Sequence, residues 1–347
     1  MKYFLHIILL MFIFSTFLGC KREVPIVENE ERTDILRIYV QDSFANSDFF
    51  QQVINLFTEL YDCTIELVTL SDEEKLLTQI IADRDSLRAD LALGITNLDI
   101  YRAMSTNLFI PYEPVNLRNL RERNMLLDSR HRFIPIDYAY FAFIYDKEIV
   151  LDPPKTFGEF QSSVWHDRLI MMDPRTSVTG HGLLMWIIGL FGDRGFEIYW
   201  ERVRRNIFTL YSSHEQAYID FLTDIAPMML TYNTTLLRTR SEGHFDRFES
   251  FIPEEGGFME INYAAILDGS PNLFLARRFV DFMLTREIQQ LLPHLHWRYP
   301  VISGVQLPLS FSEIPIPKND LTETIHSRNA LFTENWIETW INIIGIQ

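Results

Sequence analysis

The stretch ILRIYVQDSFANSDFFQQVINLFTELYDCTIELVTL, residues 35–70, decides the fold. Residues 35–40 alternate and are rich in β-formers, residues 49–61 carry apolar side chains at helical spacing, and residues 64–70 are strand-like again. Ser71 and Glu74 then form an S-x-x-E capping box for a second helix, which leads to a third strand in ADLALGI, residues 89–95. Strands that alternate with helices in this way predict a parallel α/β sheet.

A parallel sheet binds ligands in the crevice beyond the carboxyl ends of its strands. The loops that follow the three strands are residues 41–45, 71–73 and 96–99, so we expect functional residues there. About 310 residues remain after the N-terminal segment, which exceeds a typical single domain. The length therefore predicts two lobes with separate cores.

The N-terminus has the pattern of an export signal. Residues 1–19, MKYFLHIILLMFIFSTFLG, combine a basic residue with an apolar run, and Cys20 follows as a lipid-modifiable thiol. We therefore expect a lipoprotein signal peptide at 1–19, lipid attachment at Cys20, and an anchor and tether at 20–34. The membrane is then a partner through the N-terminal lipid, and the folded part lies outside the cytoplasmic membrane. An uncleaved membrane anchor is the alternative.

Composition and motifs narrow the function. The net charge of −16 argues against a nucleic-acid partner, because phosphates require basic surface. The nine histidines do not fall into metal-ligand spacing, so no metal and no cofactor is expected. Neither G-x-S-x-G nor H-E-x-x-H occurs, and neither a P-loop nor G-x-G-x-x-G is present. The sequence therefore predicts a binder and not an enzyme.

Two groups of residues suit a small ligand. The segment DPRTSVTGHGLLMW, residues 173–186, places hydroxyls and glycines at the start of an apolar helix, where an anion could bind and where the glycines would let it approach. The alternative is that a hydroxyl merely caps this helix. Stacking on a flat or cationic ligand is expected from Tyr138, Tyr140, Tyr232, Trp297 and Tyr299, with Asp42 and Asp137 as acids nearby.

Several blocks then resemble a known family. The run FIPIDYAYFAFIYDKEIVLDPPKTFGEF, residues 133–160, is similar to the segment that crosses between lobes in extracytoplasmic solute-binding proteins of ABC importers. Together with QDSF, ADLALGI, DPRTSVTGHGLLMW, AYIDFLTDIAPMMLTYNTT and HWRYPV, it follows the order found in the thiamine-binding members. The resemblance covers about residues 35–312.

The resemblance implies an α/β, two-lobed periplasmic-binding-protein fold of type II, with the ligand cleft between the lobes. Lobe 1 would comprise residues 35–135 plus 258–300, and lobe 2 residues 136–257 plus 301–347. It also implies thiamine or its phosphates as the ligand and an ABC transporter membrane permease as a partner. The family's binding positions fall here on Asp72, Glu73, Ser177, Val178, His214, Tyr232, Asn233, Thr234 and Thr235.

Three positions depart from the family's pattern. His214 replaces a tryptophan, Glu73 a glycine and Val178 a threonine. A histidine that charges near pH 6 to 7 would repel a thiazolium, so we expect thiamine binding to weaken as the pH falls. These changes leave the identity of the ligand open among free thiamine, its phosphates and a related cationic pyrimidine. Two other functions stay open: a binding protein for polyamine, ferric iron or sulfate, and a cell-envelope lipoprotein enzyme. Iron-binding proteins of this shape use adjacent tyrosines, so the Asn233 that follows Tyr232 argues against iron.

Overall fold

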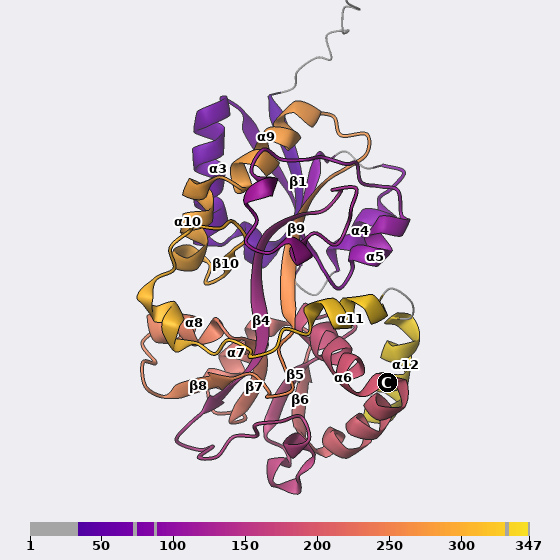
Figure 1. Ribbon diagram of the computed structural model, residues 1–347, viewed down its shortest axis with the longest axis vertical. Helices are drawn as coiled ribbons and strands as arrows, with labels where there is room; N and C mark the ends of the chain where they lie inside the picture. The colour runs from indigo at the N-terminus through magenta and orange to yellow at the C-terminus, as the bar shows by residue number, and fades with distance from the viewer. Residues whose placement is uncertain (1–33, 72–74, 87–88, 330–332, 346–347) are drawn as a thin grey trace, which may run out of the picture. The chain divides into compact units, whose positions relative to one another are not determined.

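The computed structural model describes residues 34–71, 75–86, 89–329 and 333–345, which belong to one compact unit. Figure 1 shows two α/β lobes, joined by the paired strands β4 (Ile134–Asp146) and β9 (Met259–Ile266). The strand order β2-β1-β3-β9-β4-β7-β5-β6 runs through both lobes, with β8 and β10 attached to β4. The expected two-lobed binding-protein fold is present.

The first lobe is built on the predicted parallel strands. Strand β1 pairs in parallel with β2 and β3, and β9 lies antiparallel between β3 and β4. Helices α3, α9 and α10 pack against one another beside this sheet (Figure 1). The elements are β1 (Ile35–Gln41), α2 (Asp42–Ala45), α3 (Asp48–Tyr61), β2 (Thr64–Leu70), α4 (Leu76–Ala82), β3 (Leu91–Thr96), α5 (Ile100–Ser105), η1 (Leu117–Asn119), η2 (Arg123–Met125), α9 (Leu273–Met283), α10 (Arg286–Leu295) and β10 (Tyr299–Pro300).

The second lobe surrounds the other half of β4. That half pairs antiparallel with β7 and β8, and β5 pairs in parallel with β6 and β7. The elements are η3 (Glu159–Gln161), η4 (Ser163–Trp165), β5 (Leu169–Met172), α6 (Val178–Val203), η5 (Arg204–Asn206), β6 (Ile207–Tyr211), α7 (His214–Leu222), β7 (Met228–Tyr232), α8 (Thr235–Ser241), β8 (Phe248–Phe251), η6 (Leu309–Glu313), α11 (Thr322–Asn329) and α12 (Thr333–Ile344).

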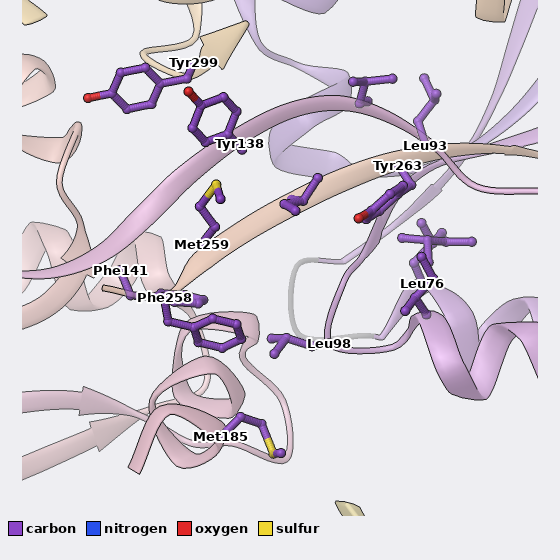
Figure 2. Close-up of a cluster of buried hydrophobic side chains, with 14 of the residues drawn as sticks. Leu76, Leu93, Leu98, Tyr138, Phe141, Met185, Phe258, Met259, Tyr263 and Tyr299 are labelled. Carbon is purple, nitrogen blue, oxygen red and sulfur yellow. The ribbon is translucent and has the colours of Figure 1, made fainter. Parts of the chain in front are cut away.

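Strand β4 changes lobe without a break. Residues 134–140 pair with β9 in the first lobe, and residues 141–145 pair with β7 in the second. Because the strand is continuous, it offers no loop at which to divide the chain, and the lobe bounds predicted from the sequence stay a prediction. Buried side chains follow the same path: Figure 2 shows Tyr138 beside Tyr299 in the first lobe and Phe141 beside Phe258 at the crossing.

Local structure corrects two expectations. The Pro pair and Thr156 in DPPKTFGEF predict a turn and a new helix, but only the 3-10 turns η3 and η4 form there, with the Thr156 hydroxyl accepting a bond from the Glu159 N–H. The apolar side chains of residues 273–292 have helical spacing, and this segment divides into α9 and α10, because the Thr285 hydroxyl accepts from the Ile288 N–H and starts a new helix. Trp336 and Trp340, four residues apart, predict a last amphipathic helix, which is confirmed as α12, and Trp340 packs edge-on against Trp200.

The signal peptide, Cys20 and nearly all of the tether lie outside the described residues, as does Glu74 of the predicted capping box. Within the described ranges, no helix combines the length and apolar character needed to cross a membrane.

Candidate functional site

A cavity of about 210 Å³ lies between the two lobes. The first lobe lines it mainly with residues at the ends of β1 and β3, on β9 and after α10: Gln41, Ser43, Phe44, Leu93, Gly94, Thr96, Ile136, Glu260, Asn262, His296 and Arg298. The second lobe lines it from the start of α6, the start of α7 and the end of β7: Ser177, Val178, Thr179, Ser212, His214, Glu215 and Tyr232. Both lobes therefore contribute to one site, and the first-lobe loops are those that the sheet topology predicts.

The start of α6 presents hydrogen-bonding groups to this cavity. Ser177 is the N-cap residue, yet its side chain makes no capping bond; its Oγ lies 2.9 Å from the Thr179 Oγ1. The main-chain N–H groups of Val178 and Thr179 have no hydrogen-bond partner among the described residues. The helix that begins here is continuous as far as the non-helical Gly192 (φ 68°), and it adds the positive end of its dipole. This arrangement can accept a partly negative ligand group.

The glycines of this segment serve packing and not ligand approach, which corrects the expectation from the sequence. A Cβ on Gly180 would lie 2.8 Å from the carbonyl carbons of Met172 and Asp173. A Cβ on Gly182 would lie 2.5 and 2.8 Å from two ring carbons of Phe141. Such distances are too short for carbon atoms, so the glycines let α6 lie directly against β5 and β4.

A buried charge cluster forms the opposite wall. The Arg298 Nε donates to Asp137 Oδ1 at 2.8 Å, and its Nη2 donates to Glu260 Oε1 at 3.1 Å. The Tyr232 hydroxyl donates to Glu260 Oε2, and the Asn262 amide donates to Asp137 Oδ1 at 2.8 Å. Glu260 and Arg298 are 4 % and 6 % exposed, and Asp137 is fully buried. The chain thus holds a guanidinium between two carboxylates beside the ligand space.

Burial sets the protonation of this cluster. It raises the pKa of the Glu260 carboxyl, as Asp137 does, while Arg298 and the Tyr232 hydroxyl act in the opposite direction. Burial lowers the pKa of Arg298, but the charges of Asp137 and Glu260 raise it by more, so the guanidinium stays charged. The Arg298 Cζ also lies 4.9 Å from the centre of the Tyr232 ring, a cation-π distance.

His214 lies at the cavity with its ring held in place. Its Nε2 lies 2.8 Å from the Thr231 hydroxyl, and its ring is tilted against Tyr232 at a centroid distance of 5.8 Å. Burial and then the charge of Arg238 lower the pKa of His214 to about 4. His214 is therefore neutral near pH 6 to 7, contrary to the expectation from the sequence. Its neighbour Glu215 forms a two-bond ion pair with Arg238, both bonds measuring 2.6 Å.

A small cavity of about 20 Å³ shares Gln41, Gly94, Thr96 and Val178 with the main one. Lys75, Asp99 and His181 also line it. Burial lowers the pKa of Lys75, raises that of Asp99 and, with the charge of Lys75, lowers that of His181 to about 3. In the described part of the chain, no group of three or more His, Cys, Asp or Glu side chains could hold a metal ion.

Four of the residues predicted for the site line the cavity: Ser177, Val178, His214 and Tyr232. Asp72 and Glu73 lie outside the described residues. Nine others do not line the cavity: Asp42, Asp137, Tyr138, Tyr140, Asn233, Thr234, Thr235, Trp297 and Tyr299. Asp137 lies behind Arg298 as its ion-pair partner, and the fully buried Asn233 amide donates to the Tyr299 hydroxyl and the Pro315 carbonyl.

Aromatic stacking is also used differently from the expectation. Tyr138 and Tyr299 stack on each other at 5.0 Å in the interior, and the Tyr140 hydroxyl points to Asp320 at 3.4 Å. Trp297 has a positive φ of 49°, and its two neighbours, His296 and Arg298, line the cavity in its place.

Sequence reasoning missed the acids and the base that reach the cavity, namely Glu215, Glu260 and Arg298, together with Phe44, Asn262 and His296. A signal was present for several. Arg298 stands inside the HWRYPV block, Phe44 inside QDSF, and Glu215 beside His214. Glu260 and Asn262 alternate along one strand, which places both on the same face.

Two lobes that share a crossing strand and line a polar and aromatic cavity define the class of two-lobed ligand-binding proteins. Comparison with known proteins specifies the family. Residues 96–320 match the family described as bacterial extracellular solute-binding protein, and the chain belongs to this family. It is accordingly a solute binder and not an enzyme.

Individual relatives agree with this assignment. The chain is 30 % identical over 311 residues to the thiamine-binding periplasmic protein of Escherichia coli, covering 88 % of this chain and 92 % of that protein. It is 28 % identical to the protein of the same name from Brucella abortus, covering 89 % and 91 %. A solved periplasmic thiamin binding protein superposes with a TM-score of 0.81 at 29 % identity, covering 89 % and 96 %.

Proposed function

We propose that the protein captures thiamine or a thiamine phosphate and presents it to the membrane permease of an ABC importer. The observation that carries this proposal is the cavity itself, which brings an aromatic side chain, a carboxylate and free main-chain N–H groups to one space between the lobes. Thiamine consists of a permanently charged thiazolium and an aminopyrimidine, and its phosphates add an anion.

Each part of that ligand has a suitable partner in the cavity. Glu260 offers negative charge to the thiazolium, and the Tyr232 side chain lines the same space. Asn262 and Gln41 supply amide groups that can bond an aminopyrimidine. The start of α6, with Ser177 and Thr179, suits a phosphate or hydroxyl group. The relatives named thiamine-binding support the same ligand.

We further propose a periplasmic location, on the outer side of the cytoplasmic membrane, with a lipid on Cys20 as the anchor. The names of the relatives support the periplasm, and the sequence pattern before Cys20 supports the anchor. A Cys20→Ser variant expressed in the host should then leave the membrane fraction, whereas wild type stays in it.

Isothermal titration of the protein, purified without residues 1–19, tests the ligand. Thiamine, its monophosphate and its diphosphate are titrated separately, and spermidine and ferric citrate serve as competing candidates. One-to-one binding of at least one thiamine compound is expected. Heat only with spermidine or iron, or no heat and no thermal stabilisation with any thiamine compound, would contradict the proposal.

A further inference from the structure

The cavity wall carries more negative than positive charge close to the ligand space. Glu260 and Asp137 flank one guanidinium, that of Arg298, at hydrogen-bond distance on both sides. All three side chains are buried, so water screens them little. Asp137 Oδ2 has no hydrogen-bond partner among the described residues, which leaves part of its charge uncompensated.

Other charged groups at the site do not cancel this excess. The negative charge of Glu215 is balanced by its two-bond ion pair with Arg238, and its side chain is half exposed to solvent. Lys75 and Asp99 oppose each other in the small adjoining cavity. The two cavity histidines, His214 and His296, both have a pKa lowered to about 4, chiefly by burial, and are neutral at pH 7.

Glu260 is the carboxylate of the cluster that a ligand meets. It lines the cavity, as Arg298 does, whereas Asp137 lies behind Arg298. Each Glu260 oxygen accepts one bond, from Arg298 or Tyr232, and a carboxylate oxygen can accept a second from a ligand. The Tyr232 side chain, whose hydroxyl donates to Glu260, lines the same space.

We propose that Glu260 is a specificity-determining residue that selects a ligand ring carrying one positive charge over a neutral ring of the same shape. This inference rests on the proposed function and assigns the discrimination to one side chain. A cation that enters restores charge balance beside Asp137, Arg298 and Glu260, whereas a neutral ring leaves the excess negative charge in a space from which water has been displaced.

The test compares thiamine with 3-deazathiamine, a neutral isostere in which carbon replaces the charged ring nitrogen. Dissociation constants are measured for wild type, Glu260→Gln and Glu260→Asp. The control is Glu59→Gln, which changes the net charge equally at a position on α3 away from the cavity. Thermal melting confirms that each variant is folded.

Wild type and Glu59→Gln should prefer thiamine by about tenfold or more, a difference of about 1.4 kcal/mol. Glu260→Gln should lose most of this preference through weaker thiamine binding, and Glu260→Asp should keep part of it. An equal affinity of wild type for both compounds, or an unchanged preference in folded Glu260→Gln, would overturn the inference. The wild-type comparison needs no variant, and absence of thiamine binding to wild type would instead overturn the proposed function.

Discussion

Replacing Gly182 by alanine tests whether the close approach of α6 to β4 shapes the site. The new Cβ would lie 2.5 and 2.8 Å from Phe141 ring carbons, whereas carbon atoms pack at about 3.5 to 4.0 Å, so the ring must move by about 1 Å. Phe141 is fully buried and stacks on Tyr232 at 5.5 Å, so little free space is available. Overpacking of this kind costs about 1–3 kcal/mol, and the better helix propensity of alanine returns up to about 1 kcal/mol.

We therefore expect Gly182→Ala to lower the unfolding free energy by about 1–2 kcal/mol and to weaken thiamine binding by about three- to tenfold through the displaced Tyr232. Urea denaturation and calorimetric titration measure the two effects. Phe141→Leu removes the obstructing ring atoms, so the double variant should be more stable than the sum of the single changes predicts, by about 1 kcal/mol.

The matched control is Gly158→Ala, because a Cβ there meets only the Thr156 hydroxyl at an ordinary 3.6 Å. It should change stability by less than about 0.5 kcal/mol. If Gly182→Ala behaves like this control, or if Phe141→Leu gives no rescue, the packing argument is refuted.

Two further predictions concern protons. Because burial and the charge of Arg238 lower the pKa of His214 to about 4, wild type and His214→Trp should show parallel thiamine affinity curves between pH 8 and 5.5. A fall in affinity at lower pH should instead disappear in Glu260→Gln, because burial raises the pKa of the Glu260 carboxyl in wild type and a bound cation favours its charged form. A pH dependence that His214→Trp removes would contradict this assignment. The second prediction concerns His181 and His326, for which burial lowers the pKa to about 3 and about 4. Below pH 6.5 the unfolded chain therefore binds more protons at these histidines than the folded chain does. The unfolding free energy should decrease by up to about 1.4 kcal/mol per pH unit for each histidine as the pH falls from 6.5 to about 4. Urea denaturation at several pH values measures this slope. The slope should be smaller in His326→Gln and unchanged in the control His294→Gln, whose position is exposed. Equal slopes in wild type and both variants would refute the prediction.

Much of the architecture could be predicted because it follows from local patterns. The alternation of strands and helices at 35–95 predicted a parallel sheet, and the pairing of β1 with β2 and β3 confirms it. The aromatic run at 133–147 was expected to be extended, and β4 is one strand across both lobes. The division of 273–292 into two helices was missed, since a single hydroxyl at Thr285 decides it against a continuous apolar face.

The site was predicted only where its residues stand on a local signal. Ser177 was found because a hydroxyl before an apolar helix marks an N-terminus, and Tyr232 because it stands at a strand end within a family-like block. The role of the glycines was misjudged, since the sequence cannot show that Phe141 and the Met172 carbonyl lie against them. The pKa of His214 was misjudged for the same reason: its burial depends on distant elements.

Local patterns are enough to predict the α/β class, the extended run that becomes β4 and the start of α6, because propensity, periodicity and capping act over a few neighbouring residues. Which charges meet the ligand space depends instead on contacts between distant segments of the chain. Asp137 and Arg298 are 161 residues apart, and Glu260 and Arg298 are 38 apart, yet they form one buried cluster. Pairing of β4 with β9 and with β10 brings them together, and the low polarity of the interior gives their mutual attraction a strength that no local pattern encodes.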